Sequence, residues 1–332
     1  MTTPPARPAL VHRNSVGRTS LSITRRYATV GLIVILFVVF SFASPTFLTS
    51  SNLTDLLITE GVPTCIAFAA MFPLIIGEFD LSLGYMLGFI AIVGAQLALW
   101  NVPSWLLALI MIALGALLGF INGILTVWLR ISAFIATLAT GIILGALSNG
   151  ISNGQILFGG VGADLVAIGR GSSFGVGNSI WIALGMAIVL FYVFEHTPLG
   201  RHFYAIGGSE AVAFLAGIST RKLRVSAYTM AGLITGIGGV FALGNRGGAD
   251  PSYGSALLLP AYAAVFLGVT THRPGQYNVI GTVVAIVLLA VGFNGLSLIG
   301  IPFWAEPLFD GLVLLVAVLI ASREARQVKV GM

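Results

Sequence analysis

Long apolar segments divide this chain and constrain its fold more than any other feature of the sequence. The hydrocarbon core of a bilayer is about 30 Å thick, so a helix that crosses it needs roughly 20 mostly apolar residues. Ten segments of about this kind are predicted to span a membrane. Their ranges are 27–47, 56–76, 84–100, 104–129, 132–152, 180–195, 224–244, 255–271, 277–299 and 307–321. The sequence therefore predicts an all-α polytopic membrane protein.

The composition excludes several classes of protein. Only 8% of the 332 residues are charged and 57% are hydrophobic, whereas a soluble domain has about 25% charged residues. The net charge of +5 does not indicate a nucleic-acid partner, because the basic residues lie between apolar segments and not along a groove. The single cysteine, Cys65, excludes a disulfide framework and a thiolate metal cluster. We expect no metal and no cofactor.

Basic residues indicate the orientation. Residues 1–26 contain five arginines and no acid, so this tail is expected in the cytoplasm. With ten spans, every other basic residue except Arg170 and Arg246 also falls on the cytoplasmic side, which predicts cytoplasmic N- and C-termini. The expected organisation is a basic tail over 1–26, a transmembrane domain over 27–321 and a cytoplasmic tail over 322–332. The first span is interpreted as an anchor and not a cleaved signal, because it is long and Pro45 stands where cleavage would occur.

Glycines at four-residue spacing predict close helix packing. Gly115, Gly119 and Gly123 share one face of the fourth span. The spacing recurs at 84/88, 141/145 and 232/236. Helices in lipid associate through small residues that let their backbones approach, so we interpret nearly all of these glycines as packing residues.

The chemistry that the chain lacks is informative. No glycine is followed by lysine, and Lys222 and Lys329 are the only lysines, so a phosphate-binding P-loop is absent. The four histidines form no H-E-x-x-H pair. The chain is therefore predicted not to hydrolyse ATP. Few acids lie in or beside the spans, so an ion-driven pump is not favoured; Glu60 could have a gating or ion-binding role, or could simply reach interfacial water.

The segment Thr197–Lys222 joins the sixth and seventh predicted spans. Gly207-Gly208 is predicted to form a turn, Ser209 to cap a helix, and residues 211–216 to form a short apolar helix that ends at Gly217. Such a helix would project from the membrane domain and offer a small apolar surface to a partner on the cytoplasmic side. The alternative is a surface helix that rests on lipid headgroups.

The chain resembles the permeases of the ribose/xylose/galactose type of ATP-binding-cassette (ABC) importers over about residues 27–321. Three motifs carry the resemblance: Gly207-Gly208-Ser209 with the Ala-rich helix to Ala216-Gly217-Ile218; Phe79-Asp80-Leu81-Ser82-Leu83-Gly84; and Gly119-Phe120-Ile121-Asn122-Gly123 with Phe134-Ile135-Ala136-Thr137-Leu138 and Thr140-Gly141. Two features depart from the family's pattern. Glu78 stands where the family usually has a second glycine, and residues 268–275 replace a glycine-rich loop.

The resemblance implies an ABC importer permease fold in a bacterial cytoplasmic membrane. It implies four partners: an ABC ATPase subunit, a second permease of the same or another sequence, an extracytoplasmic sugar-binding protein and a small sugar. Segment 197–222 would then hold the coupling helix that docks on the ATPase. The residues expected at that contact are Gly208, Glu210, Ala211, Ala213, Phe214 and Gly217.

A sugar pathway needs groups that match hydroxyls, without fixed charge, and apolar walls for the ring faces. The candidate residues are Asp80, Ser82, Asn122, Phe134, Thr137, Thr140 and Asn294. Helix–helix hydrogen bonding and packing are their alternative roles, and helix capping is the expected role of Asp80. The alternative function is an ion-coupled secondary transporter of a small polar solute. Neither the sugar nor the role of the 268–275 loop follows from the sequence.

Overall fold

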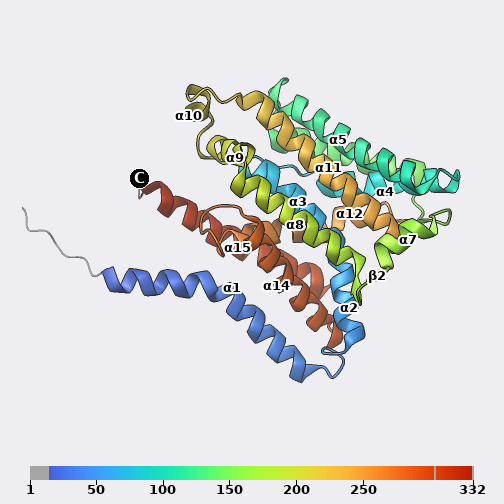
Figure 1. Cartoon of the computed structure of the whole chain (residues 1–332), viewed down its shortest axis with the longest axis horizontal. Coiled ribbons are helices and arrows are strands. Elements are labelled where there is room, and N and C mark those ends of the chain that lie inside the picture. The colour runs from blue at the N-terminus through green and yellow to red at the C-terminus, as the bar shows by residue number, and fades with distance from the viewer. Residues whose placement is uncertain (1–14, 303, 331–332) are drawn as a thin grey trace, which may run out of the picture.

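The computed structural model describes residues 15–302 and 304–330, with side chains from 29 to 320 apart from Phe303 and Glu306. The described part is almost entirely helical (Figure 1). Its helices are α1 (Ser15–Ala43), α2 (Ser50–Thr59), α3 (Gly61–Ile75), α4 (Leu83–Leu99), α5 (Ser104–Val127), α6 (Ala133–Ser152), α7 (Ala163–Arg170), α8 (Asn178–His196), α9 (Pro198–Gly208), α10 (Glu210–Leu215), α11 (Thr220–Arg246), α12 (Tyr253–Ala256), α13 (Leu258–Gly268), α14 (Val279–Leu298) and α15 (Ala305–Val330).

The described residues also contain four short strands, which the all-α prediction did not include. They are β1 (Leu157–Phe158), β2 (Ser172–Ser173), β3 (Val176–Gly177) and β4 (Gly248–Ala249). β1 pairs with β4 and β2 with β3, both antiparallel. These pairs only brace the loops at the end of the bundle where α7 lies, and the fold remains a helical bundle.

The membrane helices follow the predicted apolar segments with altered ends. Six helical stretches are long and apolar enough to cross a bilayer, and four shorter apolar helices accompany them, at 29–43, 83–99, 253–268 and 307–320 in the described chain. The second predicted span, 56–76, is broken at Glu60 between α2 and α3, and the eighth, 255–271, is broken at Leu257 between α12 and α13. The molecule is a polytopic membrane protein.

Helix α3 is the centre of the bundle. Nearly all of its side chains are buried, and they share one apolar core with residues of α4, α8, α9, α11, α13 and α14. Pro73 lies inside this helix, where the surrounding helices exclude lipid from the freed backbone groups. The second predicted span therefore contains the most enclosed helix among the candidate membrane spans of the described residues.

The glycine spacing of the fourth predicted span produces a close contact between two long helices. A Cβ atom at Gly119 would lie 2.2 Å from the carbonyl oxygen of Tyr228, and one at Gly115 would lie 2.3 Å from that of Gly232. The backbones of α5 and α11 therefore touch along their length (Figure 1). We call this contact, formed by Gly115, Gly119, Gly232 and Gly236, the glycine seam. It confirms the packing role predicted for these glycines.

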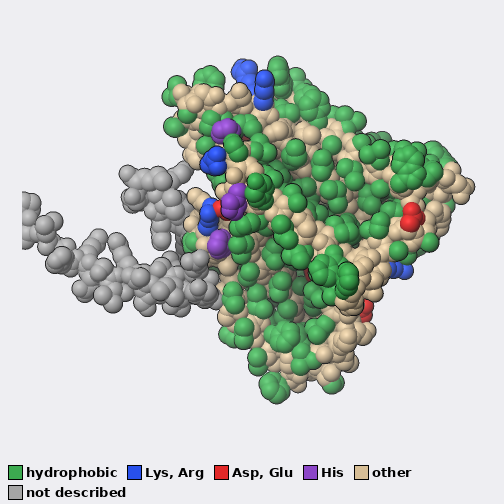
Figure 2. Space-filling model, in the orientation of Figure 1, with side chains coloured by type: hydrophobic (Ala, Val, Ile, Leu, Met, Phe, Trp, Pro, Cys, Tyr) green, Lys and Arg blue, Asp and Glu red, His purple; other side chains and the backbone are tan. Residues whose placement is uncertain are grey.

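Charge is distributed toward the ends of the bundle. Figure 2 shows apolar side chains over most of the visible face, with basic residues and histidines gathered at the end where α9 and α10 lie. Arg170 and Arg246 lie together at the other end, where Arg170 Nη2 donates to the carbonyl of Arg246 at 3.0 Å. This separation is the one that the basic residues predict. The arginines and the lysine of the two tails lie outside the residues whose side chains are described.

Candidate functional site

The segment between α8 and α11 consists of α9, which packs against the helical core, and α10, which is mostly exposed. Within α9, Phe203 is fully buried beside Phe72 of α3. A Cβ atom at Gly207 would lie 1.9 Å from the carbonyl oxygen of Ile75, so α9 rests directly on the end of α3. The predicted turn at Gly207-Gly208 is wrong: both residues end α9, because glycine is what permits this approach of the two backbones.

Helix α10 follows as a short projecting helix. Ser209 caps it by accepting a hydrogen bond from the Val212 N–H, and Gly217 ends it with φ at +82°. Three large apolar side chains are well exposed: Val212 at 64%, Phe214 at 68% and Leu215 at 84%. Exposed apolar side chains on so small a helix indicate a surface that another molecule covers.

The predicted contact residues do not all face outward. Gly208, Glu210, Ala211, Phe214 and Gly217 are exposed on or beside α10. Ala213 is buried and packs into the core. Val212 and Leu215 are also exposed but were not among the predicted contact residues. The sequence could have revealed them, since both are large apolar residues in the predicted short helix.

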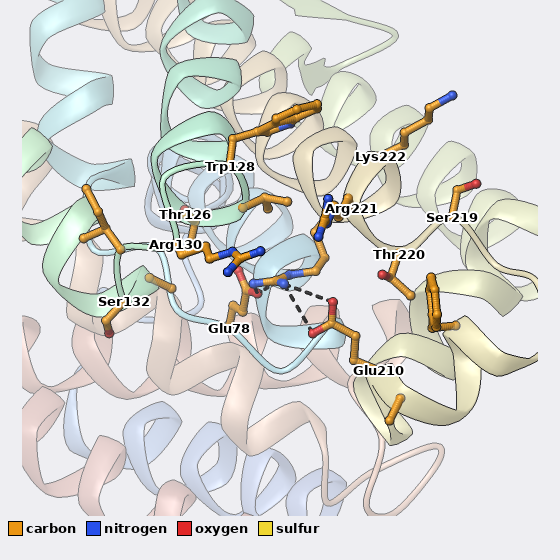
Figure 3. Close-up of a pocket in the computed structure, with 16 residues that line it drawn as sticks. Glu78, Thr126, Trp128, Arg130, Ser132, Glu210, Ser219, Thr220, Arg221 and Lys222 are labelled. Carbon is orange, nitrogen blue, oxygen red and sulfur yellow. Dashed lines mark hydrogen bonds and ion pairs between the residues drawn. The ribbon is translucent and has the colours of Figure 1, made fainter.

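A cleft of about 1230 Å³ opens beside α10. Its walls are the end of α5, the turn before α6, α10 and the beginning of α11. Figure 3 shows Arg130 directed into this cleft and Lys222 directed away from it, with Trp128 on the wall opposite Glu210. The cleft therefore lies between the projecting helix α10 and the ends of α5, α6 and α11.

An ion-paired bridge crosses the floor of this cleft. Arg224, in the first turns of α11, donates from Nη1 to Glu210 Oε1 at 3.0 Å and from Nε to Glu78 Oε1 at 2.6 Å. A second guanidinium nitrogen, Nη2, also contacts Glu78. The Tyr228 hydroxyl donates to the other oxygen of Glu78 at 2.6 Å. Figure 3 shows Glu78 and Glu210 approaching one guanidinium from two sides.

A buried polar network lies two residues further along the chain from Glu78. Asp80 Oδ1 accepts hydrogen bonds from the Ser82 N–H at 3.0 Å and the Ser82 hydroxyl at 2.6 Å. These bonds close a turn before α4, whose N-cap is Ser82, so Asp80 does not cap the helix as expected. Asn122 of α5 donates to the Ser82 hydroxyl at 2.8 Å, and the Leu81 N–H donates to the Thr137 hydroxyl of α6 at 3.0 Å. The turn at 77–82 is thus bonded to α5 and α6.

The environment of Asp80 disfavours its charge. Its side chain is fully buried, and this burial raises the pKa of Asp80 from 3.8 to about 6, although the Ser82 hydrogen bonds act in the opposite direction. The carboxyl group therefore binds a proton more readily than an exposed one.

The predicted pathway residues separate into two places. Asp80, Ser82, Asn122 and Thr137 are buried in the network, while Phe134 is 54% exposed and Thr140 partly exposed on α6. Asn294 is elsewhere. It exchanges hydrogen bonds with Asn52 at 2.8 and 2.9 Å and lines a cavity of about 370 Å³.

That second cavity also brings together acidic residues, among them Glu60, for which a gating or ion-binding role was considered. Glu60 and Asp310 both line it, with Asp55 beside them and apolar residues of α13 and α14 opposite. Across the described residues, no group of three or more His, Cys, Asp or Glu side chains could hold a metal ion.

The atypical loop at 268–275 lies at the same end of the molecule as α9. Arg273 pairs with Glu195, near the end of α8, at 2.5 Å. The Tyr204 hydroxyl of α9 donates to the carbonyl of Tyr277 at 2.6 Å. This loop is therefore bonded to the end of α8, and the residues just after it are bonded to α9.

Comparison with known proteins places the chain in a family. The family model described as branched-chain amino acid transport system / permease component matches residues 52–319. The chain is 30% identical over 295 residues to the ribose import permease protein RbsC of Escherichia coli (strain K12), which covers 88% of this chain and 92% of that protein. No solved structure matches the chain.

Other relatives are named for ribose or for D-allose. The ribose import permease protein RbsC of Bacillus subtilis (strain 168) is 32% identical over 293 residues, or 88% of this chain and 91% of that protein. The D-allose transport system permease protein AlsC of Escherichia coli (strain K12) is 28% identical over 295 residues, or 88% and 90%. With its long apolar helices, the chain therefore belongs to the family of branched-chain amino acid transport system permease components, as a multi-pass transport permease of the cytoplasmic membrane.

Proposed function

We propose that this chain is the transmembrane subunit of an ABC importer that brings a monosaccharide or a related polyhydroxylated solute into the cytoplasm. The observation that carries the proposal is the similarity, over most of both chains, to import permeases for ribose and to a D-allose permease. An L-arabinose ABC transporter permease is also similar, at 28% identity over 312 residues. Pentoses and hexoses therefore define the substrate class.

The proposed topology has ten spans with both termini in the cytoplasm. The six long and four shorter apolar helices supply the ten spans. The end with α9, α10 and the cleft is then cytoplasmic, and the end with Arg170 and Arg246 is extracytoplasmic. This orientation presents α10 to a soluble partner inside the cell.

The proposed partner at α10 is an ABC ATPase subunit. Val212, Phe214 and Leu215 supply an apolar knob, and Glu210 supplies a charge at its N-terminal end. A short rigid helix can transmit a push from an ATPase to α11, which begins five residues after α10 ends. A second permease and an extracytoplasmic sugar-binding protein would complete the importer.

The transport cycle would be alternating access driven from outside the chain. ATP binding by the partner moves α10, and the helices open toward the binding protein. A preference of a few kcal/mol for one facing state is enough for ATP to switch such a site. The proposed pathway runs along the face of α6 that exposes Phe134 and Thr140, with Ser82, Asn122, Thr137 and Asp80 holding the wall behind it. Asn294 would contribute through its separate cavity.

A panel of labelled solutes tests the substrate class. Cells that lack the gene and the same cells complemented with it are compared for uptake of ribose, allose, arabinose, galactose and leucine at micromolar concentrations. We expect complementation to restore uptake of one or more sugars and not of leucine. Restored uptake of leucine alone would refute the sugar assignment despite the family's description.

A further inference from the structure

The carboxylate of Glu78 is largely shielded from solvent at the end of the central helix α3. Glu78 lies in the turn between α3 and α4, and only 13% of its side chain is exposed. A buried carboxylate destabilises a protein unless ion pairs and hydrogen bonds compensate for its lost hydration. Glu78 has that compensation in full, because Arg224 contacts one oxygen and Tyr228 the other.

The same guanidinium holds the projecting helix. Arg224 uses Nε and Nη2 for Glu78 and Nη1 for both oxygens of Glu210, at 3.0 and 3.2 Å. Planar multidentate pairing fixes the direction of a guanidinium more strongly than a single contact does. Glu78 therefore sets where Arg224 points, and Arg224 sets where the first residue of α10 lies.

The turn that holds Glu78 continues directly into the buried network. Leu81 and Ser82, three and four residues later, are hydrogen-bonded to Thr137 of α6 and Asn122 of α5. A continuous set of bonds thus runs from Glu210 through Arg224 and Glu78 to the helices that would line the pathway. The bonds at each end are short, and a single residue separates Glu78 from Asp80.

We propose that Glu78 is a positioning residue that links the coupling helix to the transport pathway, so that movement of α10 reaches α6 through Arg224 and the turn at 77–82. The inference rests on the proposed function, since it requires an ATPase that moves α10. It adds a specific route, carried by a carboxylate in the turn between α3 and α4.

The test uses the full chain with the ATPase that co-purifies with it, reconstituted in lipid nanodiscs. Ile135→Cys places a reporter on α6 at a side chain that is 61% exposed, and the native Cys65 is buried. The rate of labelling by a membrane-impermeant maleimide is measured with ADP and with ATP plus vanadate. Glu78→Gln is compared with Glu195→Gln, which removes the charge from another buried carboxylate, paired with Arg273, at the same end of the molecule.

We expect the nucleotide to change the labelling rate in the parent and in Glu195→Gln. Glu78→Gln should reduce that change about fivefold or more, the usual range of a coupling between sites, while the same amount of ATPase co-purifies. Glu210→Gln should have a similar effect, and the double variant should be no worse than either single variant, because both act through Arg224.

Three results would overturn the inference: a full nucleotide response in Glu78→Gln, an equal loss in Glu195→Gln, or independent losses that add in the double variant. A parent protein that binds the ATPase but shows no response at residue 135 would also refute the route to α6. Failure of the proposed function is distinguishable, because then no ATPase co-purifies with the parent chain at all.

Discussion

The glycine seam and the α9–α10 segment hold α11 in opposite ways. Along the seam, α5 and α11 touch backbone to backbone, so no side chain can adjust there. At its beginning, α11 is joined to α10 by the Arg224 ion pair and a short connection, and α10 exposes most of its apolar residues. The comparison shows how one helix can belong to a rigid frame and still respond to a partner at its end.

The difference also separates two kinds of polar interaction. Glu78 and Asp80 are two residues apart, but Glu78 joins a partly exposed bridge and Asp80 a closed, buried network. Substitutions in the seam and the network should therefore affect stability, whereas substitutions in the bridge and α10 should affect coupling.

The largest effect is expected at the seam. Gly119→Leu would place atoms where the Tyr228 carbonyl lies, 2.2 Å from the new Cβ, and should cost about 3 kcal/mol or more of stability. We expect little monodisperse protein after detergent extraction, measured by size-exclusion chromatography of a fluorescent fusion. Gly185→Leu, at a helical glycine with no atom within 4 Å, should behave as the parent. Equal yields of the two variants would contradict the seam.

The next largest effect is expected at α10. Glu210→Lys puts a cation beside Arg224 in place of its carboxylate partner, so α10 should lose its position. We expect sugar uptake to fall at least tenfold while the protein keeps its melting temperature. Asp164→Lys, an exposed acid on α7 at the opposite end, is the matched control. Loss of uptake in the control alone would reverse the proposed orientation.

A smaller effect is expected in the buried network. Asn122→Leu leaves the Ser82 hydroxyl without the donor at 2.8 Å and should cost about 1–3 kcal/mol of stability. Because Asn122 lies behind the proposed pathway, the KM for the transported sugar should stay unchanged. Thr140→Val, at a partly exposed position of α6, should do the reverse and raise the KM with little change in melting temperature. A raised KM in Asn122→Leu would place this residue in the pathway itself.

The smallest effect is a pH dependence. Since the folded state raises the pKa of Asp80 to about 6, folding takes up a proton between pH 4 and 6, and stability falls as pH rises through this window. The parent should lose about 1 kcal/mol between pH 5 and pH 7 that Asp80→Asn does not lose. Melting curves of both proteins in one detergent at the two pH values measure this. An equal change in melting temperature between the two pH values in both proteins would show that Asp80 has an ordinary pKa.

The sequence predicts the features that depend on local pattern. Apolar length predicts where the membrane helices lie, glycine spacing predicts the seam, and Ser209 and Gly217 mark both ends of α10. These features follow from a few neighbouring residues, so they need no knowledge of what packs against them.

Features that depend on distant contacts were not predictable. Gly207-Gly208 has the composition of a turn, but the approach of Ile75 makes it the end of α9. The bond between Glu78 and Arg224 joins residues 146 positions apart, and only the departure of Glu78 from the pattern of similar permeases marked it. The second predicted span, 56–76, has its C-terminal end within one residue of the end of α3, but the break at Glu60 and the earlier start of α2 at Ser50 were not predicted, because apolar length alone does not mark them.

The central claim is that an ATPase drives this chain through α10, and co-purification tests it most directly. The tagged chain is extracted gently from its native membrane, and the proteins bound to it are quantified by mass spectrometry for the parent and for Glu210→Lys. We predict a stoichiometric ABC ATPase with the parent and its loss with the variant. A chain that purifies alone and transports its solute in vesicles under an ion gradient without ATP would contradict the account.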